Sequence, residues 1–359
     1  MTTQTSVAPQ INAERLNAIV GRAVDDFGAV LSAELVVLGD KLGLYRTLQR
    51  IGPSSPAQLA AATDTAEAYV RPWLVNQAAA GYVDYDPASG AYSLSPEQAM
   101  VFATDDTPAS MAGGFEVVTA AIKAEPRIAE LLRSGSGLPW ASHDDGLFTG
   151  TARFFKPGYL GNLVQSWIPA LEGIAPKLER GATVADVGCG HGVSTIIMAQ
   201  AYPQSRFIGF DSHAPSIEAA RRAAAEAGVS DRLTFEVASA TEFPGSNYDL
   251  IALFDCLHDF GDPEGAARHL HAAVAPDGSA MVVEPMAGDR VEENFNPIGR
   301  IYSGASVLIC TPNALANGGT VLGTIATEPE LRDVFTRAGF GTFRRATETP
   351  TNRIFEARR

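Results

Sequence analysis

A cluster of three glycines follows an acidic residue in the stretch VADVGCGHGVST, residues 184–195. Such a cluster costs conformational entropy, so it indicates either a sharp turn or a ligand that must approach the backbone closely. The spacing is G-x-G-x-G, whereas the dinucleotide fingerprint needs Gly or Ala one position later, where this chain has Val193. The glycines alone are compatible with a sharp turn or with a closely bound ligand, and their spacing argues against a dinucleotide as that ligand. They are Gly188, Gly190 and Gly192.

Polar or small residues also stand at the ends of the neighbouring predicted strands. Asp211 ends the segment RFIGFD, roughly 20 residues after the glycines, where a carboxylate can bind the two hydroxyls of a ribose. Because four successive strand ends face one crevice, a ribose-containing cofactor without a pyrophosphate fits best. The other candidate cofactor residues are Asp186, Ser212, Ser239, Ala240 and Asp255.

The elements that must position these residues alternate between strand and helix patterns. This alternation predicts an α/β fold with a parallel, doubly wound, Rossmann-like sheet, whose ligands bind beyond the carboxyl ends of the strands. The predicted strands are residues 183–188, 205–211, 233–238, 248–255 and 278–285, and the predicted helices are residues 192–202, 214–228 and 262–274.

The N-terminal part has a different, mainly helical pattern. We expect a helical arm up to about residue 30, helices over 33–48, 55–63 and 67–82, and then a hairpin turning at Asp86–Gly90. Three helices followed by a hairpin predict a winged-helix domain. The expected organisation is a winged-helix domain (1–100), a helical connector that covers the next domain (101–175) and a ligand-binding α/β domain (176–359).

Composition narrows the classes of function. The 359 residues carry a net charge of −14, which disfavours a nucleic-acid partner because phosphate binding needs a basic face. No basic cluster followed by an apolar run opens the chain, so we expect no signal peptide. Three cysteines show neither metal-ligand spacing nor a disulfide framework, and a reducing cytoplasm is the expected setting.

The longest uncharged stretch covers residues 301–327. It contains Pro312, Asn313, Asn317 and the pair Gly318-Gly319. Such a segment is a poor membrane span, and we expect a buried or site-facing loop instead. Its uncharged, Gly- and Asn-rich character suggests a neutral, partly apolar ligand.

The successive motifs VADVGCGHG, FDSH and YDLIALFDCLHD resemble those of class I S-adenosylmethionine-dependent methyltransferases. This resemblance covers about residues 175–359, and the N-terminal part resembles the winged-helix dimerisation domain of small-molecule O-methyltransferases. It implies that the glycine loop lies near the amino-acid end of S-adenosylmethionine and that Asp211 holds the ribose. Ser239 replaces an acid that is common near the adenine in that family.

The segment CLHDFGD resembles the HDW-S-D stretch of plant-type O-methyltransferases. The resemblance implies that His258 is the general base, and Glu284 matches the first of two acids that orient it. No acid follows Gly318-Gly319, where the family carries the second. A role for His258 in lining the site without acting as base therefore stays equally open.

Other histidines and aromatic residues receive lesser roles. We expect His191 and His213 on the cofactor side or at the surface, and His143, His269 and His271 at the surface. The candidate substrate-lining aromatic residues are Phe154, Tyr159 and Trp167.

The leading hypothesis is a homodimeric enzyme that transfers a methyl group from S-adenosylmethionine to a small molecule, preferably at oxygen, without a metal. S-adenosylhomocysteine would be the product, and neither nucleic acid nor membrane would be a partner. One alternative is a cofactor-sensing, winged-helix DNA-binding regulator without catalysis. Only Arg71 offers a base-reaching cation in the second and third predicted helices, which argues against it. An NAD-dependent oxidoreductase is disfavoured by the glycine spacing.

Overall fold

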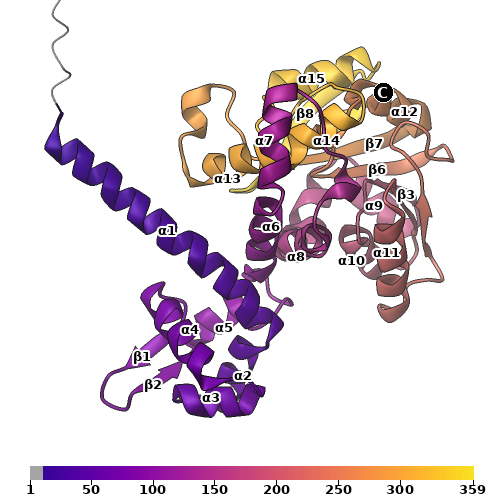
Figure 1. Ribbon diagram of the computed structural model, residues 1–359. Coiled ribbons are helices and arrows are strands. Elements are labelled where there is room, and N and C mark those ends of the chain that lie inside the picture. Colours follow the sequence, from indigo (N-terminus) through magenta and orange to yellow (C-terminus); the bar gives the residue numbers. More distant parts are fainter. Residues whose placement is uncertain (1–10) are drawn as a thin grey trace, which may run out of the picture. The chain divides into compact units, whose positions relative to one another are not determined.

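The computed structural model describes residues 11–359, which divide into two compact units with the boundary between Thr104 and Asp105 (Figure 1). The predicted boundary at residue 100 lies four residues earlier. The stretch predicted as a connector, 101–175, falls almost entirely within the second unit.

The first unit consists of helices and a short hairpin, as expected for a winged helix (Figure 1). Ser55 and Ser95 begin their helices with capping boxes, each followed by a proline at the first helical position. The predicted arm and most of the following predicted helix form one continuous helix, which ends just before Gly43, a residue with φ of +67°. The elements are α1 (Ala13–Lys41), α2 (Leu44–Ile51), α3 (Pro56–Thr63), α4 (Glu67–Ala79), β1 (Asp84–Asp86), β2 (Ala91–Ser93) and α5 (Pro96–Phe102).

The second unit contains a seven-stranded sheet in the order β5-β4-β3-β6-β7-β9-β8. The five strands from β5 to β7 are parallel, as predicted, whereas β9 is antiparallel to both β7 and β8. The sequence analysis did not predict these last two strands. The strands are β3 (Thr183–Val187), β4 (Arg206–Asp211), β5 (Leu233–Val237), β6 (Tyr248–Phe254), β7 (Val274–Pro285), β8 (Thr342–Glu348) and β9 (Asn352–Arg358).

Helices cover both faces of this sheet. Successive residues of one strand enter different apolar clusters: Val184 packs with residues of α9, α10 and α11, and Ala185 packs with residues of α12 and α15. Strands buried on both faces explain the nearly continuous apolar runs in the sequence. The helices are α6 (Ala112–Ile122), α7 (Glu125–Ser134), α8 (Asp145–Asn162), α9 (Ile174–Arg180), α10 (Val193–Ala201), α11 (Ala214–Glu226), α12 (Pro263–Ala273), α13 (Pro297–Ala305), α14 (Thr311–Ala316) and α15 (Glu328–Arg337).

Two expectations are wrong in detail. Residues 301–327 are mostly helical rather than a loop, because α13, a π-helical turn at Ser306–Cys310 and α14 follow one another without a break. His143 is buried rather than at the surface. Within residues 11–359, no helix has the length and apolar character that a membrane crossing requires.

Candidate functional site

The glycine loop joins β3 to α10, and its three glycines all have positive φ. A Cβ on Gly188 would lie 2.7 Å from Sγ of Cys256, and a Cβ on Gly192 would overlap the ring of Phe235. A Cβ on Gly190 would meet no atom within 4 Å. Both readings of the cluster therefore apply: two glycines allow tight packing, and Gly190 leaves its open side free for a ligand.

Asp186 lies beneath this loop rather than on its ligand side. Its carboxylate accepts hydrogen bonds from the hydroxyls of Ser194 (2.7 Å) and Thr195 (2.6 Å), and the residue is fully buried. Burial raises the pKa of Asp186 to about 6, although the two hydroxyl donors act to lower it. The predicted cofactor residue Asp186 thus holds the start of α10 in place.

Asp211 ends β4 and braces the same loop. One of its carboxylate oxygens accepts from the backbone N–H of Gly190 at 2.9 Å, and the other accepts from that of His213 at 2.8 Å. Burial raises the pKa of Asp211, while these two donors act to lower it. The carboxylate is therefore fixed in orientation beside Gly190.

A cavity of about 560 Å³ opens at the carboxyl ends of β3, β4, β5 and β6. This is where the strand order reverses, the position at which ligands bind in doubly wound sheets. The predicted site residues that line it are Gly188, Gly190, Asp211, Ser212, Ser239, Ala240, Asp255 and Tyr159. Those that do not line it are Asp186, Gly192, His258, Glu284, Phe154 and Trp167.

Several lining residues come from segments that the strand and motif patterns could not place. The ring of Phe148, on α8, lies 4.5 Å from that of His213, centroid to centroid, and 5.5 Å from that of Trp140. Asn313, on α14, accepts from the backbone N–H of Trp140 and donates to the carbonyl of Asp259. The uncharged segment was expected to face the site, and it does so from a helix. The residues missed are Trp140, Phe148, Thr151, Phe155 and Asp259.

Asp255 follows β6 in an unusual backbone conformation, with φ of +50°. Its N–H donates to the carbonyl of Val283, and its Oδ1 accepts from Nδ2 of Asn352 at 2.8 Å. Burial, reinforced by the charge of Glu284, raises the pKa of Asp255 well above its usual value. Non-glycine residues with positive φ are uncommon, and they concentrate at functional sites.

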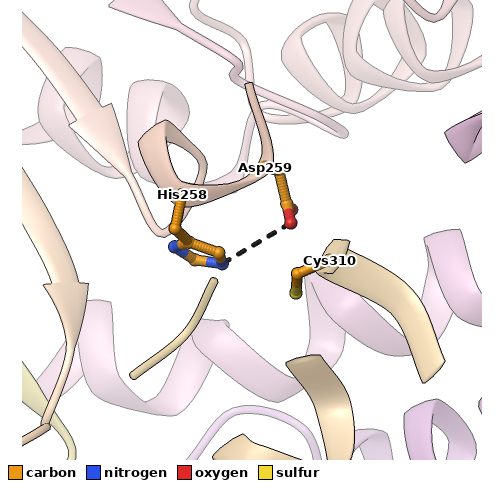
Figure 2. A group of neighbouring side chains, drawn as sticks. All are labelled: His258, Asp259 and Cys310. Atoms are coloured by element: carbon orange, nitrogen blue, oxygen red, sulfur yellow. Dashed lines mark ion pairs between the residues drawn. The ribbon is translucent and has the colours of Figure 1, made fainter. Parts of the chain in front are cut away.

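His258 lies on the short turn Leu257–Asp259 and is only 3% exposed. Its Nδ1 donates to Oε2 of Glu284 at 2.7 Å, and its Nε2 lies 3.7 Å from Oδ1 of Asp259 (Figure 2). Burial acts to lower the pKa of His258, but the carboxylates of Glu284 and Asp259 and the neighbouring Cys310 together raise it by more, so it lies well above the usual value. Asp259 thus supplies a second carboxylate beside the imidazole. In the family that the sequence resembles, the second acid follows the Gly-Gly pair, and this chain has no acid after Gly318-Gly319.

Cys310 completes the surroundings of this imidazole. One ligand atom each from His258, Asp259 and Cys310 lies within 4.8 Å of the other two (Figure 2). Oδ1 of Asp259 is buried and has no hydrogen-bond partner. The sequence analysis found no metal-type cluster, because Cys310 lies far along the chain and no local spacing links it to the histidine.

Comparisons with known proteins agree with this geometry. Residues 178–335 match the family model described as a methyltransferase domain, and residues 30–104 match that of the Rv2258c-like winged HTH domain. The C-terminal half of the chain thus contains a segment that is similar to a methyltransferase domain. The prediction of a class I S-adenosylmethionine-dependent methyltransferase fold behind a winged-helix domain is confirmed.

Individual relatives match only part of the chain. A tRNA (guanine-N(7)-)-methyltransferase of Edwardsiella ictaluri is 33% identical over 90 residues, which are 24% of this chain and 36% of the relative. The ubiquinone biosynthesis O-methyltransferase of Pseudomonas paraeruginosa is 32% identical over 132 residues, 36% and 53% of the two chains. These matches span between 18% and 53% of the relatives' own lengths.

Likeness of fold extends further than likeness of sequence. The structure of human N-acetylserotonin methyltransferase in complex with S-adenosylmethionine superposes with a TM-score of 0.71, covering 98% of this chain and 99% of that one. The identity is 17%, so this likeness concerns the fold.

Proposed function

We propose that this methyltransferase chain transfers a methyl group from S-adenosylmethionine to a small-molecule acceptor, preferably to an oxygen atom. The observation that carries the proposal is the juxtaposition of Gly190 and Asp211 at the wall of one cavity. The open side of Gly190 admits a ligand to the backbone, and the fixed carboxylate of Asp211 is a suitable acceptor for ribose hydroxyls.

S-adenosylmethionine, when bound, supplies an activated methyl group on a sulfonium sulfur. The chain itself supplies binding and alignment, which account for much of the rate when the cofactor carries the reactive group. Asp211 ends β4 and Ser212 follows it, whereas Ser239 and Ala240 come after β5, so these residues can hold the nucleoside end between them. Phe148, whose ring lies beside that of His213 at an interplanar angle of 40°, adds an apolar wall.

The acceptor end of the cavity is assigned to the side of Asp259. Tyr159, Phe155 and Trp140 give this cavity aromatic surface, and Asn313 and Asn317 give it uncharged polar surface. Such a lining suits a neutral, partly apolar acceptor. His258 and Glu284 stand behind Asp259 and serve this end, although neither lines the cavity; Phe154 and Trp167 have no proposed contact with the acceptor.

A small-molecule acceptor is favoured over nucleic acid. The net charge is −14, and Arg71, the one Lys or Arg within α3 and α4, forms an ion pair with Glu67. A DNA reader needs several free cations for phosphates. We therefore assign a role in dimerisation to the winged-helix domain. We also assign the chain to a reducing cytoplasm. A low-salt mobility-shift assay that retarded DNA would favour the alternative of a DNA-binding regulator.

The decisive experiment has two parts. Calorimetry with S-adenosylhomocysteine tests the cofactor assignment, and saturable binding is expected. Incubation with S-adenosylmethionine and a library of phenols, amines and carboxylic acids, followed by mass spectrometry, then identifies the acceptor from the added methyl group. Absence of S-adenosylhomocysteine binding by the folded protein would contradict the proposal.

A further inference from the structure

A buried arginine lies beside the acid that holds His258. Arg353, on β9, pairs across the strands with Glu284, on β7. Directly paired residues of antiparallel strands present their side chains on the same face of the sheet. Arg353 is fully buried, and Glu284 is only 1% exposed. Complete burial of a guanidinium is rare unless the group is paired, because its charge loses the solvation of water.

The hydrogen bonds of Arg353 leave its charge without a bonded counter-charge. Nε donates to the carbonyl of Pro285 at 2.9 Å, and Nη2 donates to that of Ala326 at 2.8 Å, so both acceptors are neutral. Nη1 is buried and has no hydrogen-bond partner, and the same holds for Oε1 of Glu284. Two unpartnered polar atoms of opposite charge thus belong to one cross-strand pair.

Glu284 is the acid on which Arg353 acts most strongly. Burial lowers the pKa of Arg353, and among the neighbouring charges that of Glu284 opposes this effect most. The other charges near Arg353 are those of Arg345, Asp289 and Glu328. Arg345 and Glu328 form an ion pair with each other at 2.7 Å, so their charges largely compensate.

His258 itself is surrounded by acids. Its Nδ1 donates to Glu284, and its Nε2 lies 3.7 Å from Asp259 (Figure 2). Asp255 is near enough for its charge to interact with that of the imidazole. The neighbouring thiol of Cys310 is neutral, because burial raises its pKa to about 12. Acids around an imidazole hold a proton on it, whereas a general base must be free of that proton before it acts.

We propose that Arg353 is a positioning residue that acts through Glu284 and helps His258 to release its proton. The pair formed by His258 and Glu284 is neutral while it holds one proton, and it is negative once that proton has left. A fixed positive charge on β9 stabilises the negative state, so the proton leaves at lower pH with Arg353 than without it. This inference rests on the proposed function, in which His258 is the candidate base.

The test is a titration of the histidines in the full chain by nuclear magnetic resonance. The chain has six histidines, so ¹³C labelling at Cε1 gives few signals, and His258→Asn identifies the one from His258. In Arg353→Met, which keeps an unbranched side chain without charge, the midpoint of the His258 titration is expected about 1–3 pH units above that of wild type. Arg353→Lys keeps the positive charge and should restore most of the wild-type midpoint.

Two further variants complete the design. Arg353→Gln removes the charge but keeps a hydrogen-bond donor, and it should give the same upward movement of the midpoint even where Arg353→Met does not fold. Arg232→Met is the matched control, because Arg232 also donates to a backbone carbonyl, that of Ala199, but lies just before the start of β5. This variant should leave the His258 titration unchanged.

The results that would overturn the proposal are distinct from loss of folding. One is a His258 midpoint that is the same in wild type and in a folded Arg353→Met or Arg353→Gln protein. Another is an equal movement in Arg353→Lys and Arg353→Met, which would indicate altered packing rather than lost charge. S-adenosylhomocysteine binding, measured on every variant, checks folding and tests the proposed function separately.

Discussion

The carboxylate of Asp211 determines how a nucleoside can sit in the cavity. It accepts two backbone hydrogen bonds, from Gly190 and His213, and so links the glycine loop to the end of β4. A cofactor bound there would place its ribose against a preorganised acceptor rather than a mobile side chain.

Asp211→Ala is expected to weaken S-adenosylhomocysteine binding about 10–100-fold, because hydrogen bonds to a charged group contribute roughly 1.5–3 kcal/mol. Titration calorimetry measures the change. Asp231→Ala, which removes an exposed carboxylate beyond α11, should leave the affinity unaltered. An Asp211→Ala protein that is folded and binds as tightly as wild type would refute the ribose assignment.

Gly190 offers a graded test of close approach to the backbone. Gly190→Ala adds one methyl group toward the open side, and Gly190→Val adds a branched side chain at a φ of +52°, which such residues rarely adopt. S-adenosylhomocysteine affinity should fall for Ala and be lost for Val, by calorimetry. Normal binding by the Val variant would make the loop merely a structural turn.

The His258→Ala variant tests the acceptor end of the cavity independently of the cofactor end. Turnover should fall roughly 10²–10⁴-fold once an acceptor is found, because the imidazole is the candidate general base. Cofactor affinity should persist, because His258 does not line the cavity that holds Gly190. Parallel loss of the cofactor in His258→Ala and Asp211→Ala would place His258 in the cofactor site instead.

At the scale of elements, the link between β3 and α10 depends on a buried acid. Asp186 accepts from the hydroxyls of Ser194 and Thr195, both in the first turn of α10. This connection fixes where the helix begins and therefore where the glycine loop can lie.

The raised pKa of Asp186 predicts a pH effect on stability. Between the unfolded value near 3.8 and the folded value of about 6, the native state binds more protons than the unfolded state. The stabilisation that Asp186 provides when protonated is therefore lost as pH rises through this window. Asp186→Asn should become progressively more stable relative to wild type between pH 4 and 6, by denaturant unfolding. A difference independent of pH would contradict the shift.

At the scale of the whole molecule, α1 presents an apolar surface that a soluble chain normally covers. Its apolar side chains recur at helical spacing and are 43–68% exposed. They are Leu16, Ile19, Val20, Val24, Phe27, Val30, Leu31 and Leu38. This stripe supports the proposed homodimer.

Charges placed on the stripe should disrupt the homodimer. Phe27→Glu combined with Leu31→Glu should shift the protein from dimer to monomer in light scattering, because burying two carboxylates is costly. Tyr69→Glu, at an even more exposed position on α4, should leave the mass unchanged. A wild type that is monomeric at all concentrations would rule out the homodimer.

The sequence by itself determined the parts that rest on local patterns. The alternation of strand and helix patterns placed the five parallel strands, capping residues such as Ser55 and Asp262 placed helix starts, and the glycine spacing identified the loop. Local motifs also predicted which polar or small residues stand at the ends of the strands. These features need only neighbouring residues, because backbone geometry and side-chain periodicity are local properties.

Only the tertiary structure decided which side chains meet. Cys310 reaches His258 from a distant helical segment, and Phe148 reaches His213 from α8. Asp186 and Gly192 lie outside the cavity although they belong to the same motif as Gly190, because successive residues of a strand and turn point in different directions. Such contacts depend on how the elements pack, and no spacing along the chain encodes that packing directly.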